Sequence, residues 1–219
     1  WDLVWSGLKL NFLHTSWNFE RLQNAGFLFA IYNVLKKIYE GDRENFLQAI
    51  KRNISFFNTH IFFSGAALGV VSRLEQDLDN ARPEDKDREI DSVKMGIMGP
   101  LAAIGDALFW AGIKPIAFLC GAGLLMLTGF NPANWPYAIT ISLLVYNVPR
   151  VIVKYYLLFK AYYDYKQLFV LIQNIKFQEI MKGIKIIGMV LLGGIMAGYL
   201  MTRQLEVFPN RKLDNLLLL

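Results

Sequence analysis

Cysteine is almost absent from this sequence, and histidine is nearly as rare. The chain of 219 residues contains one cysteine, Cys120, and two histidines. A single thiol cannot build a disulfide framework, and these few residues show no metal-site spacing. Cys120 lies inside an apolar run, where a cysteine usually acts as a small hydrophobic side chain. We therefore expect neither a structural disulfide within the chain nor a bound metal.

Charged residues are also scarce. They make up 19% of the chain and hydrophobic residues 54%, whereas soluble domains have about 25% charged residues. This composition favours an integral membrane protein. The net charge is +5, but the basic residues are spread along the chain and cluster beside apolar runs, as cytoplasmic flanks do. No basic array indicates binding to nucleic acid.

The centre of the sequence lacks an uninterrupted apolar helix. Residues 94–115, KMGIMGPLAAIGDALFWAGIKP, are apolar enough for a membrane, but they contain helix-breaking residues: Gly96, Gly99, Pro100 and Gly105. Asp106 adds an unpaired carboxylate, which costs on the order of 2.5–3.5 kcal/mol in hydrocarbon. Irregular backbone at membrane depth also needs protein or water around it. A segment that lines a protein-enclosed cavity meets both needs, and transporter binding sites are built in this way.

An alternative for the same stretch is a glycine-rich packing segment in which Asp106 caps a helix. Under the first interpretation, Gly99, Pro100 and Gly105 form a re-entrant tip or hinge. Gly112, Pro115 and Pro149 are then placed to act as hinges between a moving unit and a static scaffold.

The whole pattern predicts an all-α, polytopic membrane protein with re-entrant or discontinuous helices. We expect a single membrane domain, residues 1–219, in three parts. These are an amphipathic and half-helix region at 1–53, a site region at 54–115 with a cytoplasmic loop at 73–94, and transmembrane helices at 116–203. The chain begins at Trp1 instead of Met and ends in four leucines, so we expect it to be truncated at both ends.

Membrane orientation follows from the lysines. Residues 116–130, 137–159 and 183–201 are apolar and can complete spans. Lysines follow the second of these segments, which places that side in the cytoplasm, whereas the uncharged connector at 131–136, NPANWP, lies outside.

Three separated motifs resemble one known family. SWNFERLQNAGF at 16–27, FFNTH at 56–60 and GIMGPLAAIGDALFW at 96–110 resemble signatures of the IID subunit of mannose-family phosphotransferase-system (PTS) permeases. They occur in the family's order, and the resemblance covers about residues 8–208. Two positions depart from it, because Ile61 and Ala107 stand where members often have proline. Members also continue with further apolar segments beyond this point, which agrees with a truncated chain.

The resemblance implies a transport subunit in the bacterial cytoplasmic membrane. It implies an obligate IIC membrane partner, oligomers of IIC–IID pairs, and cytoplasmic IIA and IIB phosphocarriers, with IIB phosphorylating a hexose or amino sugar on entry. Mannose, fructose, sorbose and N-acetylgalactosamine systems belong to the family. No cofactor is implied.

Sugar recognition needs acids and amides that face hydroxyl groups. The candidate substrate-binding residues are Asn18, Glu20, Arg21, Asn58, Thr59, His60 and Asp106. Several have other interpretations. Glu20 and Arg21 can pair with each other or across the IIC interface, His60 can be a hydrogen-bonded packing residue, and Asp106 can hold the tip by accepting backbone N–H groups.

The sequence predicts no catalytic residue in this subunit. The histidines and Cys120 lie in or beside apolar segments, and the chain has no P-loop and no acidic Mg²⁺ site. Two alternatives remain open. One is a membrane-embedded enzyme that uses Asp106, Glu20 and His60, and the other is a structural or receptor subunit that scaffolds IIC without touching sugar.

Overall fold

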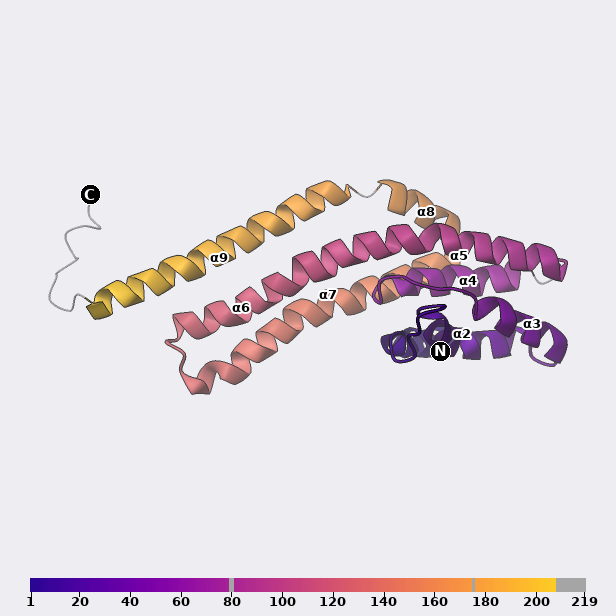
Figure 1. The fold of residues 1–219 in the computed structure, drawn as a ribbon, viewed down its shortest axis with the longest axis horizontal. Helices are drawn as coiled ribbons and strands as arrows, with labels where there is room; N and C mark the ends of the chain where they lie inside the picture. The colour runs from indigo at the N-terminus through magenta and orange to yellow at the C-terminus, as the bar shows by residue number, and fades with distance from the viewer. Residues whose placement is uncertain (79–80, 175, 208–219) are drawn as a thin grey trace. The chain divides into compact units, whose positions relative to one another are not determined.

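The computed structural model describes residues 1–78, 81–174 and 176–207, and within these ranges the chain is helical and forms no β-strand (Figure 1). The elements are α1 (Asp2–Lys9), α2 (Asn24–Ile38), α3 (Arg43–Asn53), α4 (Ser64–Asp77), α5 (Pro83–Gly105), a π-helix (Asp106–Ile113), α6 (Lys114–Leu127), α7 (Trp135–Tyr163), α8 (Tyr165–Asn174) and α9 (Phe177–Val207), with 3-10 turns at Leu10–Phe12 and Pro132–Asn134. The predicted all-α fold is confirmed. The leucines at 216–219 lie outside the described residues.

Several helices begin where the sequence supplies a cap. Asp42 accepts a hydrogen bond from the backbone N–H of Asn45 at 3.1 Å and starts α3. Pro83 opens α5, with two acidic residues in its first turn. Asn131 accepts from the N–H of Ala133 and starts the short turn before α7. Local sequence therefore accounts for these boundaries.

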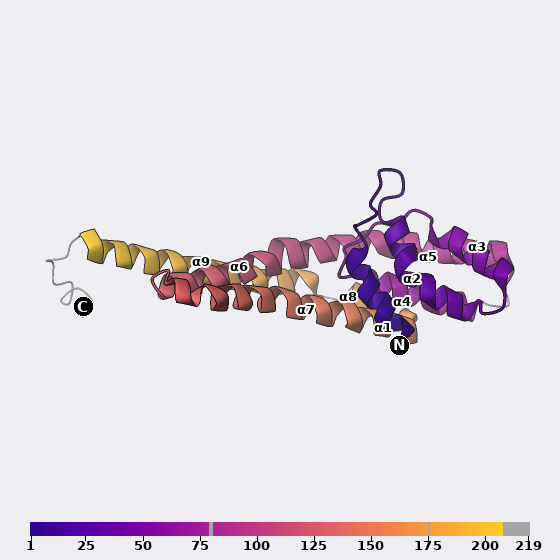
Figure 2. The ribbon, with the colours of Figure 1, turned by 90° about the horizontal axis from the view of Figure 1, so that it is seen from below.

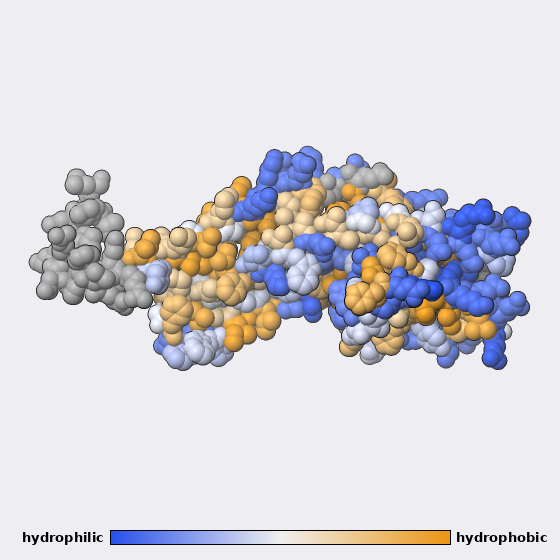
Figure 3. Space-filling model, in the orientation of Figure 1, coloured by the Kyte–Doolittle hydropathy of each residue, from blue (hydrophilic) through white to orange (hydrophobic). Residues whose placement is uncertain are grey.

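Three helical stretches are long and apolar enough to cross a membrane: Pro83–Leu127, Pro132–Tyr163 and Phe177–Met201. Apolar side chains gather over α6, α7 and α9, and hydrophilic ones over α3 and the beginning of α5 (Figure 3). The prediction of a membrane protein with several spans is confirmed. The first stretch has 45 residues, roughly twice the length that a bilayer needs, so part of it must extend beyond the hydrocarbon.

The chain forms two compact units. Unit 1 comprises Trp1–Ala111 and Asn147–Gln178, and unit 2 comprises Gly112–Tyr146 and Glu179–Leu219. One boundary falls at Gly112. Another falls at Asn147 within α7, two residues before Pro149. Both positions are near residues that the sequence analysis named as hinges, and hinge motion itself stays a prediction.

Glycines bring helices of unit 1 into close contact. Gly65 and Gly69 of α4 lie against the backbone carbonyl groups of Lys154 and Leu158 in α7. Gly26 of α2 lies against the backbone of Leu13. A side chain at any of these positions would overlap that backbone, so glycine is required there for packing.

Unit 2 contains α6, the first part of α7 and most of α9. Gly121 of α6 lies against Ala138 and Ser142 of α7, and Gly123 lies near Ile195. By contrast, a methyl group added at Gly193 or Gly194 of α9 would meet no other atom of the described residues within 4 Å.

The glycine–proline stretch has a different form from the one expected. Gly99, Pro100 and Gly105 all lie inside α5, so the backbone does not turn back at these residues. A helix tolerates Pro100 at a local cost, and the exposed Gly96 and Gly99 face open space. The discontinuity comes one residue after Gly105, where α-helical pairing changes to a π-helix that begins at Asp106. Such changes of pitch are frequent at functional sites.

The stretch predicted as a cytoplasmic loop at residues 73–94 is largely helical, and its side of the membrane stays a prediction. Residues 73–77 complete α4 and residues 83–94 begin α5, so only the short connection between them is irregular. Its charges misled the prediction, because several of them are buried: Glu75, Lys86 and Lys94. These side chains lie between helices of unit 1.

Glu75 is the centre of that buried network. Its carboxylate is fully buried and accepts hydrogen bonds from Arg52 at 2.8 and 3.0 Å, from the Tyr39 hydroxyl at 2.7 Å and from Asn53 at 2.7 Å. Lys86 donates to the backbone carbonyl of Glu75 at 2.9 Å. The network therefore joins α3, α4, α5 and the residue that follows α2.

The network also changes how its members ionise. Burial and the charge of Glu75 raise the pKa of Tyr39 and keep it a neutral donor. Burial alone would lower the pKa of Arg52, but its hydrogen bonds to Glu75 and Asp87 outweigh burial and raise it. Arg52 therefore stays protonated beside Glu75.

We predict that Glu75→Ala lowers the free energy of unfolding by roughly 3–5 kcal/mol, because it leaves Arg52 buried with one counterion fewer. Chemical unfolding of the detergent-solubilised protein measures this. The matched control is Asp77→Ala, which breaks the half-exposed pair with Arg73 and should cost less than about 1 kcal/mol. Equal losses in the two variants would show that the buried network does not hold the helices together.

Candidate functional site

The three sequence motifs meet within unit 1. The loop before α2, the irregular segment 54–63 between α3 and α4, and the middle of α5 are joined by hydrogen bonds. Segment 54–63 has no helix or sheet of its own, so its buried backbone groups need partners from elsewhere. Those partners come from the first and third motifs.

Gln23 holds the irregular segment from one side. Its amide nitrogen donates to the carbonyl oxygen of Thr59 at 2.9 Å, and its amide oxygen accepts from the N–H of Thr59 at 2.9 Å. The backbone N–H of Gln23 donates to the carbonyl oxygen of Phe57 at 2.8 Å. Gln23 thus provides hydrogen-bond partners for backbone groups of Phe57 and Thr59, much as a paired β-strand would.

Asn24 and Asn18 continue this bracing. Asn24 donates to the carbonyl oxygen of Ile54 at 2.9 Å, and its own amide oxygen accepts from Asn18 at 2.8 Å. Asn18 was predicted to bind substrate, but its side chain is occupied inside the loop.

Helix α5 holds the irregular segment from the other side. The Thr59 hydroxyl donates to the carbonyl oxygen of Met98 at 3.2 Å, and the backbone N–H of Asn58 lies 3.2 Å from the Met98 sulfur. Thr59, also predicted to bind substrate, is buried and satisfied within the chain.

His60 lies at the centre of this junction. It is 4% exposed, and its ring stacks on Phe109 with centroids 5.5 Å apart. Nδ1 accepts a hydrogen bond from the backbone N–H of Phe62 at 3.3 Å, which places the ring proton on Nε2. That Nε2 has no hydrogen-bond partner among the described residues. A buried donor without a partner is costly, and such groups are rare in folded proteins.

Gly105 makes room for His60. A methyl group on Gly105 would overlap the imidazole ring, whereas one on Gly99 would meet nothing within 4 Å. The role of Gly105 is therefore to admit the histidine.

Asp106 and Asn58 are the exposed polar residues nearest to this junction in the chain. Asp106 opens the π-helix directly after Gly105, and its charge acts on His60. Neither side chain makes a hydrogen bond or ion pair within the described part of the chain. The junction therefore offers one neutral N–H donor, one carboxylate and one amide beside an aromatic ring.

Glu20 and Arg21 belong to a different segment from His60. They lie on the loop between α1 and α2, which protrudes from its neighbours in Figure 2. Their side chains approach to only 3.9 Å and are 83% and 50% exposed. Glu20 and Arg21 therefore pair with each other only weakly, because both side chains are exposed to solvent.

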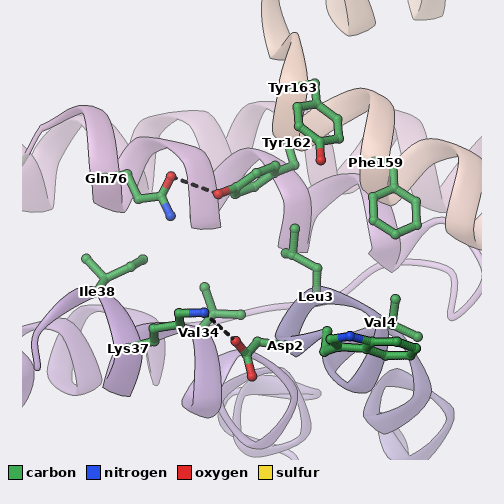
Figure 4. Close-up of a pocket in the computed structure, with 11 residues that line it drawn as sticks. Asp2, Leu3, Val4, Val34, Lys37, Ile38, Gln76, Phe159, Tyr162 and Tyr163 are labelled. Atoms are coloured by element: carbon green, nitrogen blue, oxygen red, sulfur yellow. Dashed lines mark hydrogen bonds and ion pairs between the residues drawn. The ribbon is translucent and has the colours of Figure 1, made fainter.

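A separate cleft of about 610 Å³ lies elsewhere in unit 1 (Figure 4). The Asp2–Lys37 ion pair at 3.1 Å and the hydrogen bond from Tyr162 to Gln76 at 2.9 Å lie in its wall, together with Phe159. It contains none of the predicted site residues, so the motifs do not mark this hollow.

The side chains of the described residues do not form a metal-binding cluster. Across residues 1–78, 81–174 and 176–207, no three histidine, cysteine, aspartate or glutamate residues gather closely enough to hold an ion.

Sequence reasoning missed the residues that build the junction: Gln23, Asn24, Met98 and Phe109. Gln23 and Asn24 carry a signal that could have found them, since two adjacent amides open the apolar run of α2. Met98 and Phe109 carry none, because an apolar residue in a membrane helix has many possible neighbours.

Comparison with known proteins gives a consistent result. The profile of the family described as "PTS system mannose/fructose/sorbose family IID component" matches residues 2–213. The mannose-specific EIID component of Escherichia coli (strain K12) is 31% identical over 191 residues, which cover 86% of this chain and 64% of that protein. The fructose permease IID component of Bacillus subtilis (strain 168) is also 31% identical, covering 87% of this chain and 66% of the relative. The chain thus spans about two thirds of these relatives.

Solved structures agree with the sequence relatives. The cryo-EM structure of the mannose transporter ManYZ with microcin E492 contains a chain that is 30% identical, with a TM-score of 0.67. The match covers 89% of this chain and 68% of the other. A structure described only as a membrane protein matches with a TM-score of 0.74 at 31% identity, over the same shares of the two chains.

We predict opposite effects from two glycine substitutions in α5. Gly105→Ala should displace His60 and lower stability by roughly 1–3 kcal/mol, as overpacking does. Gly99→Ala should leave stability unchanged or raise it by up to about 1 kcal/mol, because alanine favours a helix. Unfolding in detergent measures both, and equal stability of the two variants would contradict the packing of His60 against Gly105.

Proposed function

This chain belongs to the mannose/fructose/sorbose family of PTS IID components, and we propose that it forms, together with a IIC subunit, the path by which a hexose or amino sugar enters the cell. As a IID component it is part of a sugar transporter in a membrane. The proposal adds the partner, the coupling to phosphorylation and the location of the sugar site.

The observation that carries the proposed sugar site is the Nε2–H of His60, which has no partner among the described residues. This donor is buried and held by Phe109 and the N–H of Phe62, at the point where three motif segments meet. Burial removes this N–H from water, and no acceptor among the described residues replaces the lost hydrogen bond. An oxygen atom of a bound ligand can supply that acceptor. This favours direct sugar contact over the packing interpretation of His60.

A sugar fits the neighbouring groups as well. Each hydroxyl both donates and accepts, so one ring can accept from His60 and donate to the carboxylate of Asp106. Asn58 offers an amide, and aromatic rings suit the C–H faces of a sugar. Asn18 and Thr59 support this arrangement without touching the sugar, because their side chains are already bonded within the chain. Asn18 bonds to Asn24, and Thr59 bonds to the carbonyl oxygen of Met98.

Phosphoryl transfer belongs to partner proteins in this proposal. A phosphocarrier histidine must be reached by other proteins and have a ring nitrogen available. His60 is buried, and His14, although exposed, bonds to Gln23 through Nε2 at 2.8 Å. IIA and IIB therefore carry the phosphoryl group, and IIB transfers it to the sugar on the cytoplasmic side.

The proposed location is the bacterial cytoplasmic membrane, with several IIC–IID pairs assembled together. The side chains of Asp106 and Asn58, which make no hydrogen bond or ion pair within the described residues, fit a path that is completed by IIC. The outside position of the connector at 131–136 remains part of the proposal. A subunit that scaffolds IIC without touching sugar is the alternative.

We predict that His60→Ala and Asp106→Asn each weaken sugar binding by about 10- to 100-fold, the loss expected for one hydrogen bond to a buried or charged group. Binding of labelled hexoses and amino sugars to the purified IIC–IID complex measures this. His60→Gln should restore part of the affinity, because its amide also offers an N–H.

Asp77→Asn is the control, since this exposed residue is remote in the chain from the junction and should bind sugar normally. Unchanged affinity in both His60→Ala and Asp106→Asn, in a complex that is otherwise intact, would favour the scaffold alternative.

A further inference from the structure

The loop between α1 and α2 exposes a large apolar side chain. Phe19 is 92% exposed, whereas Phe12, which also precedes α2, is 56% exposed. Trp17 packs edge-on against Phe19 with ring centroids 5.0 Å apart, and is itself 46% exposed. Two neighbouring aromatic residues on one short loop thus expose apolar surface that a partner can remove from water.

The loop is held in one conformation. Asn18 and Leu22 exchange two backbone hydrogen bonds of 3.0 Å, and the side chain of Asn18 accepts from the N–H of Arg21 at 2.8 Å. Leu22 has a φ of 53°, a left-handed conformation that is rare for a leucine. The bracing that holds this conformation also fixes where residues 19–21 point.

A rigid loop with exposed apolar and charged groups has the properties of a binding element. Preorganisation lowers the entropy lost on association, and aromatic and arginine side chains commonly dominate binding energy. Glu20 and Arg21 are adjacent, opposite in charge and only weakly paired at 3.9 Å, so both can form ion pairs with a partner.

We propose that residues 17–22, the docking loop, insert into the IIC membrane subunit. Phe19 enters an apolar pocket of IIC, and Glu20 and Arg21 pair with a cation and an anion at its rim. A protein partner fits better than a lipid surface, because fixed charges of opposite sign require fixed complementary charges. An anionic leaflet would attract Arg21 but repel Glu20, so the adjacent pair gains no net attraction to it. This inference rests on the proposed function only for the identity of the partner.

The test is co-purification of the full complex after co-expression of this chain with its IIC subunit. We expect Phe19→Ala to lower the yield of IIC several-fold and Phe19→Glu to lower it at least tenfold. Glu20→Arg should weaken the complex in a salt-dependent way. The matched control is Phe12→Ala, which removes another exposed phenylalanine of unit 1 and should leave the yield unchanged.

Misfolding is controlled by the thermal unfolding midpoint of each variant, which should not change because Phe19 makes almost no buried contact. Full recovery of IIC with both Phe19 variants would overturn the docking proposal. Intact complexes that no longer bind sugar would place the loop in the sugar site and likewise overturn it, while the proposed function would hold. Failure of the unaltered chain to bind IIC would instead contradict the proposed function itself.

Discussion

The double hydrogen bond between the Gln23 side chain and the backbone of Thr59 is the constraint on which the candidate site depends. Segment 54–63 departs from regular structure within a packed unit, and its backbone groups require partners. Gln23 supplies them from the start of α2, and Met98 supplies another from α5. Because the segment is held on both sides, His60 has one fixed orientation, and the position of its Nε2–H is a property of the fold.

The structure separates polar residues that build the site from those that remain available. Asn18 and Thr59 looked like ligands in the sequence, yet both are satisfied by neighbours within the chain. Asp106 and Asn58 make no such bonds to the described residues. The distinction matters for interpreting mutations, because loss of a bracing residue changes folding and binding together, whereas loss of an available group should change binding alone.

The fold class and the long apolar helices could be predicted from the sequence, because hydrophobicity and length determine them locally. The position of the discontinuity was only nearly right, since Pro100 is accommodated within α5 and the change of pitch occurs at Asp106. The charged stretch around Glu75 was misjudged for a physical reason. A charged side chain is expected to face solvent unless a buried partner of opposite charge is known. The partner of Glu75 is Arg52, which lies 23 residues earlier in the chain, and no regular spacing identifies it. Gln23 could not be identified as a bracing residue for the same reason, because its partner Thr59 is distant in the sequence.

The position of Glu75 in the chain has a consequence for biosynthesis. Three of its side-chain partners, Tyr39, Arg52 and Asn53, precede it in the sequence, and only Lys86, whose ammonium lies 3.8 Å from the carboxylate, follows it among the described residues. Domains fold as they are synthesised, starting from the N-terminus. When the ribosome adds Glu75, these groups that neutralise or solvate its carboxylate have already been made. The acidic residue that α4 must bury can therefore be paired as soon as α4 forms, before the apolar helices that follow have been translated.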